Sequence, residues 1–112
     1  MVNNVCVIIR HSVADERFTL GLRNALATQM GGYETGLVFL GNALLSLTGA
    51  IPAYLAKTLN SYLENEGKLY YLAQDLRDLK LEAGDLAFAE AKGVDSEDLA
   101  EVLEDSDAIS TF

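Results

Sequence analysis

Several short apolar runs in this chain do not alternate with polar residues. The first, "NVCVIIRH" (4–11), is rich in β-branched residues, and "TGLVFLG" (35–41) and "KLYYLA" (68–73) have the same character. Continuous apolar runs of this length are typical of strands that are covered on both faces. The chain ends in a further short run, "AISTF" (108–112). We therefore predict a strand in each of these segments.

Between these runs, apolar residues recur every three or four positions, which is the spacing of one face of a helix. We predict a first helix that starts after Ser12 or Asp15, either of which can cap it, and stops at "GGY" (31–33). A second helix is predicted over 52–67, because Pro52 suits the first turn and Gly67 the end. A short helix is predicted over 75–79.

The remaining segments give signals of unequal strength. "DSEDLAEVLEDSD" (95–107) predicts a helix, because Asp95 or Ser96 can cap it and acidic residues fill its first turn. "NALLSLTG" (42–49) predicts a short helical or irregular piece. "AGDLAFAEAKGV" (83–94) fits a short strand or a loop equally well.

Strands alternate with helices along the whole chain, and this order favours right-handed crossovers and a parallel sheet. The predicted fold is a small flavodoxin-like three-layer α/β sandwich with a mostly parallel sheet of about five strands. At 112 residues and 50% hydrophobic, the chain is long enough for one such core, so residues 1–112 form a single domain.

Composition narrows the environment in which we expect the chain to work. No apolar stretch reaches the roughly 18 uninterrupted residues of a membrane span, and "MVNNVCVIIRH" lacks the basic start of a signal peptide. A single cysteine, Cys6, cannot form an internal disulfide, and one cysteine with one histidine makes no metal cluster. We therefore expect a cytoplasmic protein that needs neither a metal nor a cofactor.

The net charge of −9 is concentrated in the last third of the chain. Residues 1–81 carry seven acidic and seven basic side chains, whereas residues 82–112 carry ten acidic side chains and only Lys92. An acidic surface repels phosphate backbones, so nucleic acid is disfavoured as a partner. The acidic third is either a solvated surface or a docking surface for a basic partner, and the sequence leaves both readings open.

Candidate binding residues follow the predicted strands, because ligands of α/β sheets collect beyond the carboxyl ends of strands. These candidates for a small-molecule or anion-binding crevice are Arg10, His11, Asn42, Gln74 and Asp75. Each has a plain structural alternative, since Asp75 and Asn42 are natural helix caps and a lone histidine is often a surface residue. The segment "IIRHSVADE" (8–16) lacks the glycines of a phosphate loop. Nowhere in the sequence does the spacing of residues alone support a catalytic triad.

Cys6 and the tyrosines are further candidates for a functional role. Cys6 lies within the first apolar run, where burial raises the pKa of a thiol and makes it inert, although an exposed Cys6 would allow a thiol enzyme. Tyrosine suits surfaces that are partly dry and partly wet, so the tyrosines of the second long helix and third strand are candidates for subunit contacts. These interface candidates are Tyr54, Tyr62, Tyr70 and Tyr71.

Four segments together give the chain a resemblance to the DsrE/DsrF-like family, which includes the sulfur-relay subunits of the TusB, TusC and TusD type. The segments are "GLRNALATQM", "GLVFLGNALLSLTG", "YYLAQDLRDLKL" and "LEDSDAISTF", and the resemblance spans nearly the whole chain. Sulfur-carrying members have a cysteine at the end of the third strand, and by that pattern Leu72 stands in its place here.

The resemblance implies an α/β fold, a cytoplasmic location and assembly into trimers or hexamers, with copies of the chain or with sister subunits. Because Leu72 cannot accept sulfur, it also implies a non-catalytic or accessory member that takes part in sulfur trafficking. The alternative hypothesis, from the residues themselves, is a small-molecule or anion-binding domain that uses the crevice candidates.

Overall fold

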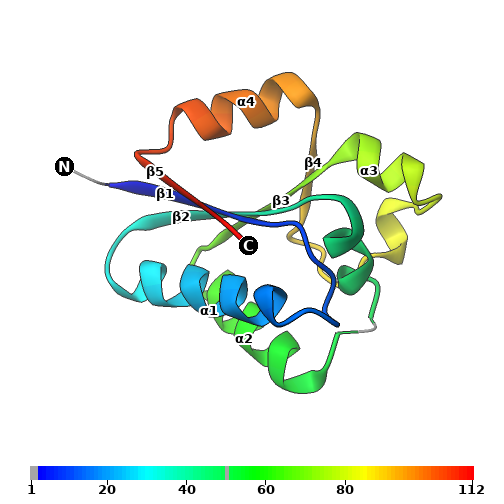
Figure 1. Ribbon diagram of the computed structural model, residues 1–112, viewed down its shortest axis with the longest axis horizontal. Helices are drawn as coiled ribbons and strands as arrows, with labels where there is room; N and C mark the ends of the chain where they lie inside the picture. Colours follow the sequence, from blue (N-terminus) through cyan, green and yellow to red (C-terminus); the bar gives the residue numbers. More distant parts are fainter. Residues whose placement is uncertain (1–2, 50) are drawn as a thin grey trace.

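The computed structural model describes residues 3–49 and 51–112 and contains one parallel sheet (Figure 1). The strand order across the sheet is β4-β3-β2-β1-β5, and every pair of neighbours is parallel. This confirms the predicted α/β class and the sheet of about five strands. The strands are β1 (Asn4–Ile9), β2 (Glu34–Phe39), β3 (Lys68–Leu72), β4 (Lys92–Val94) and β5 (Ala108–Thr111).

The helices follow the predicted order, with small changes at their ends. The first strand ends at Ile9, which is earlier than predicted. Of the two predicted caps of the first helix, Asp15 rather than Ser12 is the actual one. Its Oδ1 accepts a hydrogen bond from the Arg17 backbone N–H at 2.9 Å. The segment 83–94 contains both a turn and a short strand. The helices are α1 (Glu16–Met30), η1 (Gly41–Leu47), α2 (Ala53–Glu64), α3 (Ala73–Asp78), η2 (Ala83–Asp85) and α4 (Ser96–Glu104), of which η1 and η2 are 3-10 turns.

The strand order determines which face of the sheet each helix covers. The steps from β1 to β2, β3 and β4 all run in one direction, so right-handed crossovers place α1, α2 and α3 on the same face. The step from β4 to β5 runs back across the sheet and places α4 on the opposite face. Figure 1 shows α4 on one side of the sheet and both long helices, α1 and α2, on the other.

The face covered by α1 and α2 holds the main core. Leu37 and Phe39 of β2 are fully buried here against Phe18 and Leu22 of α1 and Leu59 of α2. The Tyr62 side chain is also buried, and its hydroxyl lies 2.8 Å from the Thr35 carbonyl and 2.6 Å from the Lys68 carbonyl. The predicted apolar stripes of both helices therefore pack onto one continuous core.

The opposite side of the sheet, which we call the α4 face, is covered much less completely. Among residues 3–49 and 51–112, the buried cluster on this face consists of Cys6, Ile8 and Val38. Around them, the hydrophobic side chains are only partly buried. These are Leu40, Tyr70, Leu99 and Leu103.

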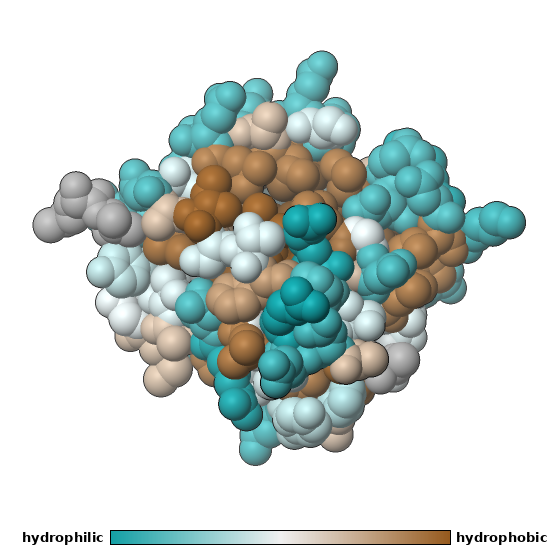
Figure 2. Space-filling view, in the orientation of Figure 1, coloured by the Kyte–Doolittle hydropathy of each residue, from teal (hydrophilic) through white to brown (hydrophobic). Residues whose placement is uncertain are grey.

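Part of this face is open to solvent along its edge. Ile109 of β5 pairs with Cys6, so both side chains lie on the α4 face, and Ile109 is 48% exposed. Figure 2 shows the corresponding hydrophobic band between α4 and strands β1 and β5. A single helix of nine residues does not cover the width of this sheet.

Candidate functional site

The carboxyl edge of the sheet contains a topological switch point between β3 and β4. After β3 the chain passes to the α1/α2 face, where Leu76 and Leu79 of α3 pack on the main core. After β4 it passes to the α4 face instead. In open α/β sheets, ligands bind where the connections that follow two neighbouring strands lead to opposite faces of the sheet. Leu72 is the last residue of β3, its side chain is half-buried, and it immediately precedes α3.

Asp75 connects the ends of β2 and β3. It lies in the first turn of α3, which begins at Ala73 and thus earlier than predicted, and its Oδ2 accepts from the Gly41 backbone N–H at 2.8 Å. Gly41 has a φ of +57°, a conformation that favours glycine. The carboxylate therefore holds the turn after β2 in place, a role that the sequence did not indicate because the two residues are 34 positions apart.

Gln74 and Asn42 do not converge on a built polar site. The Gln74 amide donates to Asp78 Oδ1 at 2.8 Å and accepts from the Arg77 guanidinium at 2.9 Å. These contacts turn the side chain along the exposed surface of α3. Asn42 lies exposed in the first turn of η1. Both residues are at the expected edge, but the amide of Gln74 is already engaged within its own helix.

His11 and Arg10 follow β1 at the same edge. The Arg10 side chain is exposed, while its backbone N–H donates to the Phe112 carbonyl at 2.7 Å and extends the pairing with β5. His11 is half-buried, and within the described residues its Nδ1 is buried without a hydrogen-bond partner. This ring nitrogen accepts a hydrogen bond when it is unprotonated, and it can donate one to an anion when it carries the proton.

Asp15 adds a carboxylate near His11. Its hydrogen bonds from the Arg17 side chain and backbone, with a smaller contribution from His11, lower the pKa of Asp15 to about 2. The Arg17 guanidinium lies 2.9 Å from Asp15 Oδ2. This carboxylate therefore stays charged and paired, and it does not provide an acid or base near neutral pH.

Cys6 lies in the middle of β1 rather than at the carboxyl edge. Its side chain is fully buried on the α4 face, and burial raises its pKa to about 11, although a hydrogen bond with Ser106 partly opposes this rise. Because only the thiolate is an effective nucleophile, Cys6 is almost entirely unreactive near neutral pH.

The tyrosines fall into two groups. Tyr62 and Tyr71 are only 1% and 6% exposed within the single chain, so their side chains are core residues and cannot make the predicted subunit contacts. Tyr54 of α2 is 63% exposed, and Tyr70 is half-buried on the α4 face. Helical spacing and strand membership do not distinguish these two environments, and only Tyr54 and Tyr70 remain as interface candidates.

Neither a cluster of metal-binding side chains nor a helix able to cross a membrane is found in the part of the chain that the structure describes. No group of three or more histidine, cysteine, aspartate or glutamate side chains in residues 3–49 and 51–112 is arranged to hold a metal ion. Over the same residues, no helix is both long and apolar enough to cross a membrane.

Comparison with known proteins gives the fold of the chain. No protein-family model and no curated protein sequence matches it. Among solved structures, the ychN protein from E. coli is similar over 100% of both chains, with a TM-score of 0.78 and 17% identity. BT1422 from Bacteroides thetaiotaomicron, a conserved protein of unknown function, is similar over 98% of this chain and 95% of its own, with a TM-score of 0.78 and 11% identity. The chain therefore has the fold of the ychN protein.

Proposed function

We propose that this chain is a non-catalytic or accessory DsrE/DsrF-like protein that oligomerises and takes part in intracellular sulfur trafficking in the cytoplasm. The observation that carries the proposal is the position of Leu72. This residue ends β3 beside the switch point, where the resemblance places the sulfur-carrying cysteine of other members. The fold shared with ychN is consistent with the same resemblance.

The proposed assembly is supported by the α4 face. Partly buried Tyr70, Leu40 and Leu103 and the exposed Ile109 form hydrophobic surface that one helix leaves open. Surfaces of this kind frequently mark protein contacts. We expect a trimer or hexamer of this chain, or a complex with sister DsrE-like subunits. Nucleic acid and membrane are not proposed as partners, because the acidic charge is unfavourable for both.

The sulfur-related part of the proposal can be tested by restoring a thiol at the edge of the sheet. In Leu72→Cys, the introduced thiolate would attack the outer sulfur of glutathione persulfide. A new S–S bond would form, the donor S–S bond would break, and glutathione would leave as a thiol. We expect this variant to gain one sulfur atom by mass spectrometry, and the wild-type chain, with its buried Cys6, to gain none.

Leu40→Cys provides the matched control. Leu40 is also half-buried and lies at the carboxyl end of a strand, directly after β2. The chain leaves β2 and β3 toward the same face, so no switch point lies beside Leu40. The introduced thiol should therefore gain sulfur more slowly than the one at position 72. Equal or faster transfer at position 40 would contradict the proposed site.

An anion-binding crevice is the second candidate function, and the unpartnered Nδ1 of His11 beside the exposed Arg10 favours it. A ligand at 100 times its Kd adds about 2.7 kcal/mol to the free energy of unfolding. Inorganic phosphate should then raise the melting temperature of the wild type but not of the Arg10→Ala, His11→Ala double variant. Equal shifts in both proteins would exclude this crevice as the binding site.

A further inference from the structure

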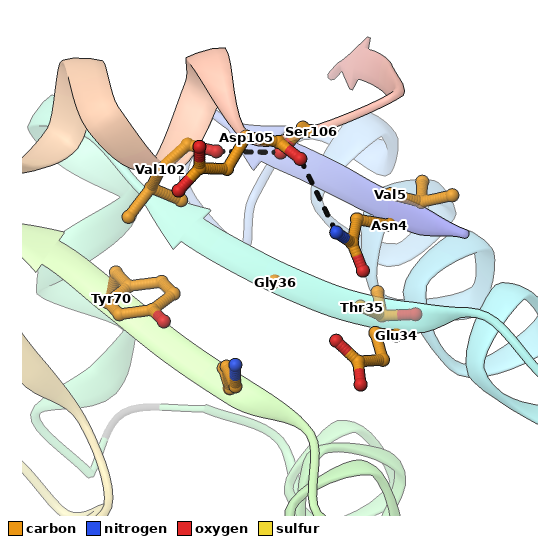
Figure 3. A pocket seen from close by; sticks show the side chains of 10 residues that line it. Asn4, Val5, Glu34, Thr35, Gly36, Tyr70, Val102, Asp105 and Ser106 are labelled. Carbon is orange, nitrogen blue, oxygen red and sulfur yellow. Dashed lines mark hydrogen bonds between the residues drawn. The ribbon is translucent and has the colours of Figure 1, made fainter. Parts of the chain in front are cut away.

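A cleft lies at the opposite, amino-terminal edge of the sheet. It is an open cleft of about 200 Å³ on the α4 face, between the start of strands β1 to β3 and the C-terminal end of α4. Figure 3 shows Asp105 and Ser106 above Gly36 of β2, with Glu34 below and the Tyr70 ring to one side. This volume suits a molecule of about the size of a small amino acid rather than a drug-sized ligand, for which pockets are typically about 300 Å³ or more.

Gly36 forms the floor of the cleft and keeps it open. Residues on either side of it in the sheet carry side chains on the same face, since Gly36 pairs with Cys6 on β1 and with Lys68 on β3. A Cβ at position 36 would lie 3.5 Å from Cε2 of Tyr70, which is an ordinary van der Waals contact. The absence of a side chain here is therefore not required by crowding, and its effect is to leave space beside the aromatic ring.

The cleft is lined by charges of both signs that do not pair with one another. Lys68 supplies an ammonium group, and Glu34 and Asp105 supply carboxylates. Among the described residues, no nitrogen of Lys68 lies within 4.0 Å of either carboxylate. All three side chains are exposed, so a ligand that carries both signs can reach them.

The negative side of the cleft is the more strongly built. The last carbonyl groups of α4 lie next to Asp105, and the end of a helix carries partial negative charge. The Asn4 side-chain amide donates to the Asp105 carbonyl at 3.4 Å, and the Ser106 hydroxyl donates to the Val102 carbonyl at 2.8 Å. The first bond ties the end of α4 to the start of β1, and the second closes the last turn of the helix beside the cleft.

We propose that this cleft binds a small zwitterion of the α-amino acid type. Glu34 and Asp105 contact its ammonium group, Lys68 contacts its carboxylate, and the Tyr70 ring and Val102 contact its apolar part. The site lies at the opposite edge of the sheet from Leu72 and does not depend on sulfur transfer there, but it shares the Tyr70 ring with the hydrophobic surface that we propose for assembly.

The test is a titration of the purified full-length chain with glycine and L-alanine, followed by amide chemical shifts in NMR. Methylamine and acetate, which each carry only one of the two charges, are the controls. We expect saturable shifts centred on Gly36, Tyr70 and Ser106 with a Kd on the order of 1 mM, and shifts at least about fivefold weaker with either control. The absence of saturable shifts with both amino acids would overturn the proposal. Equal binding of methylamine would also overturn it, because a simple cation site would then suffice.

Three variants locate the binding within the cleft. Lys68→Met and Glu34→Gln remove exposed charges and should each weaken glycine binding by about threefold to tenfold. Gly36→Ala places a methyl group in the floor and should weaken it at least as much. Lys57→Met and Glu64→Gln, which change exposed residues of α2, are the matched controls and should bind as the wild type does. Unchanged binding in the three cleft variants would overturn the proposal.

Discussion

The two faces of the sheet differ in how completely helices cover them. On the α1/α2 face, two long helices and the 3-10 turn η1 bury a continuous core that includes Leu37, Phe39 and Leu59. On the α4 face, one short helix leaves Tyr70, Leu103 and Ile109 partly or largely exposed. The α1/α2 face of the sheet therefore contributes most of the buried core, whereas the α4 face leaves hydrophobic side chains open to solvent. This difference follows from the strand order, because only the return step to β5 places a helix on the α4 face.

The largest expected effect compares leucines on the two faces. Leu59→Ala creates a cavity in the main core and should lower the free energy of unfolding by about 2–5 kcal/mol. Leu103→Ala removes a half-buried side chain and should cost about 1 kcal/mol in the dilute single chain. Urea unfolding at low protein concentration measures both. Equal costs would contradict the difference between the faces, and a cost of Leu103→Ala that grows with concentration would indicate assembly through the α4 face.

A smaller effect compares glycines on the two faces. A Cβ at Gly67 would lie 2.5 Å from the Tyr62 backbone carbonyl oxygen, which cannot move without disturbing α2, so Gly67→Ala should cost about 1–3 kcal/mol. Gly36→Ala, on the α4 face, meets only the Tyr70 ring at 3.5 Å and should stay within about 0.5 kcal/mol of the wild type. Thermal unfolding of both variants gives the comparison, and a reversed order would show that the α4 face is the more tightly packed one.

Near neutral pH the smallest expected effect is that of Cys6 ionisation, which changes the free energy of unfolding only at alkaline pH. Burial raises its pKa in the folded chain from 9.0 to about 11, so an unfolded chain loses the thiol proton first as pH rises. The contribution of this shift to stability is complete below pH 9.0 and is lost progressively as pH rises toward 11. The wild type should therefore lose stability over this interval relative to Cys6→Ala. Parallel curves for the two proteins would mean that Cys6 is not buried as described.

Local sequence signals predicted the elements of the fold but not their arrangement. Asp95 was one of two predicted caps of α4, and this prediction is confirmed because its Oδ1 accepts a hydrogen bond from the Asp98 backbone N–H at 2.8 Å. Such a cap is predictable because it depends only on neighbouring residues. The segment 83–94 stayed ambiguous because β4 has only three residues. The pattern also could not say which face each helix covers, since that depends on strand order.

The candidate site was predictable only in part for the same reason. The residues after the strands do lie at one edge of the sheet, as parallel strands require. The bond between Asp75 and Gly41 joins distant residues, and no local pattern encodes it. Tyr62 and Tyr54 lie on one helix with similar spacing to its apolar residues, yet one is in the core and the other is in solvent. A glycine inside an apolar strand marks a close approach or an open space, so Gly36 in β2 is the local feature of the sequence that indicates the cleft.

We propose that the open α4 face is a contact surface between subunits, and the native mass of the purified chain is the first measurement to make. At micromolar concentration, we expect light scattering to give three or six times the chain mass of 12.1 kDa. Ile109→Lys, which changes an exposed residue of the α4 face, should dissociate this assembly. Tyr54→Lys changes the interface candidate on the opposite face and tests that alternative contact, whereas Asn60→Lys, at another exposed residue of α2, is the matched control that should leave the assembly intact. A wild-type monomer would contradict the claim, and dissociation by Tyr54→Lys alone would place the contact on the opposite face.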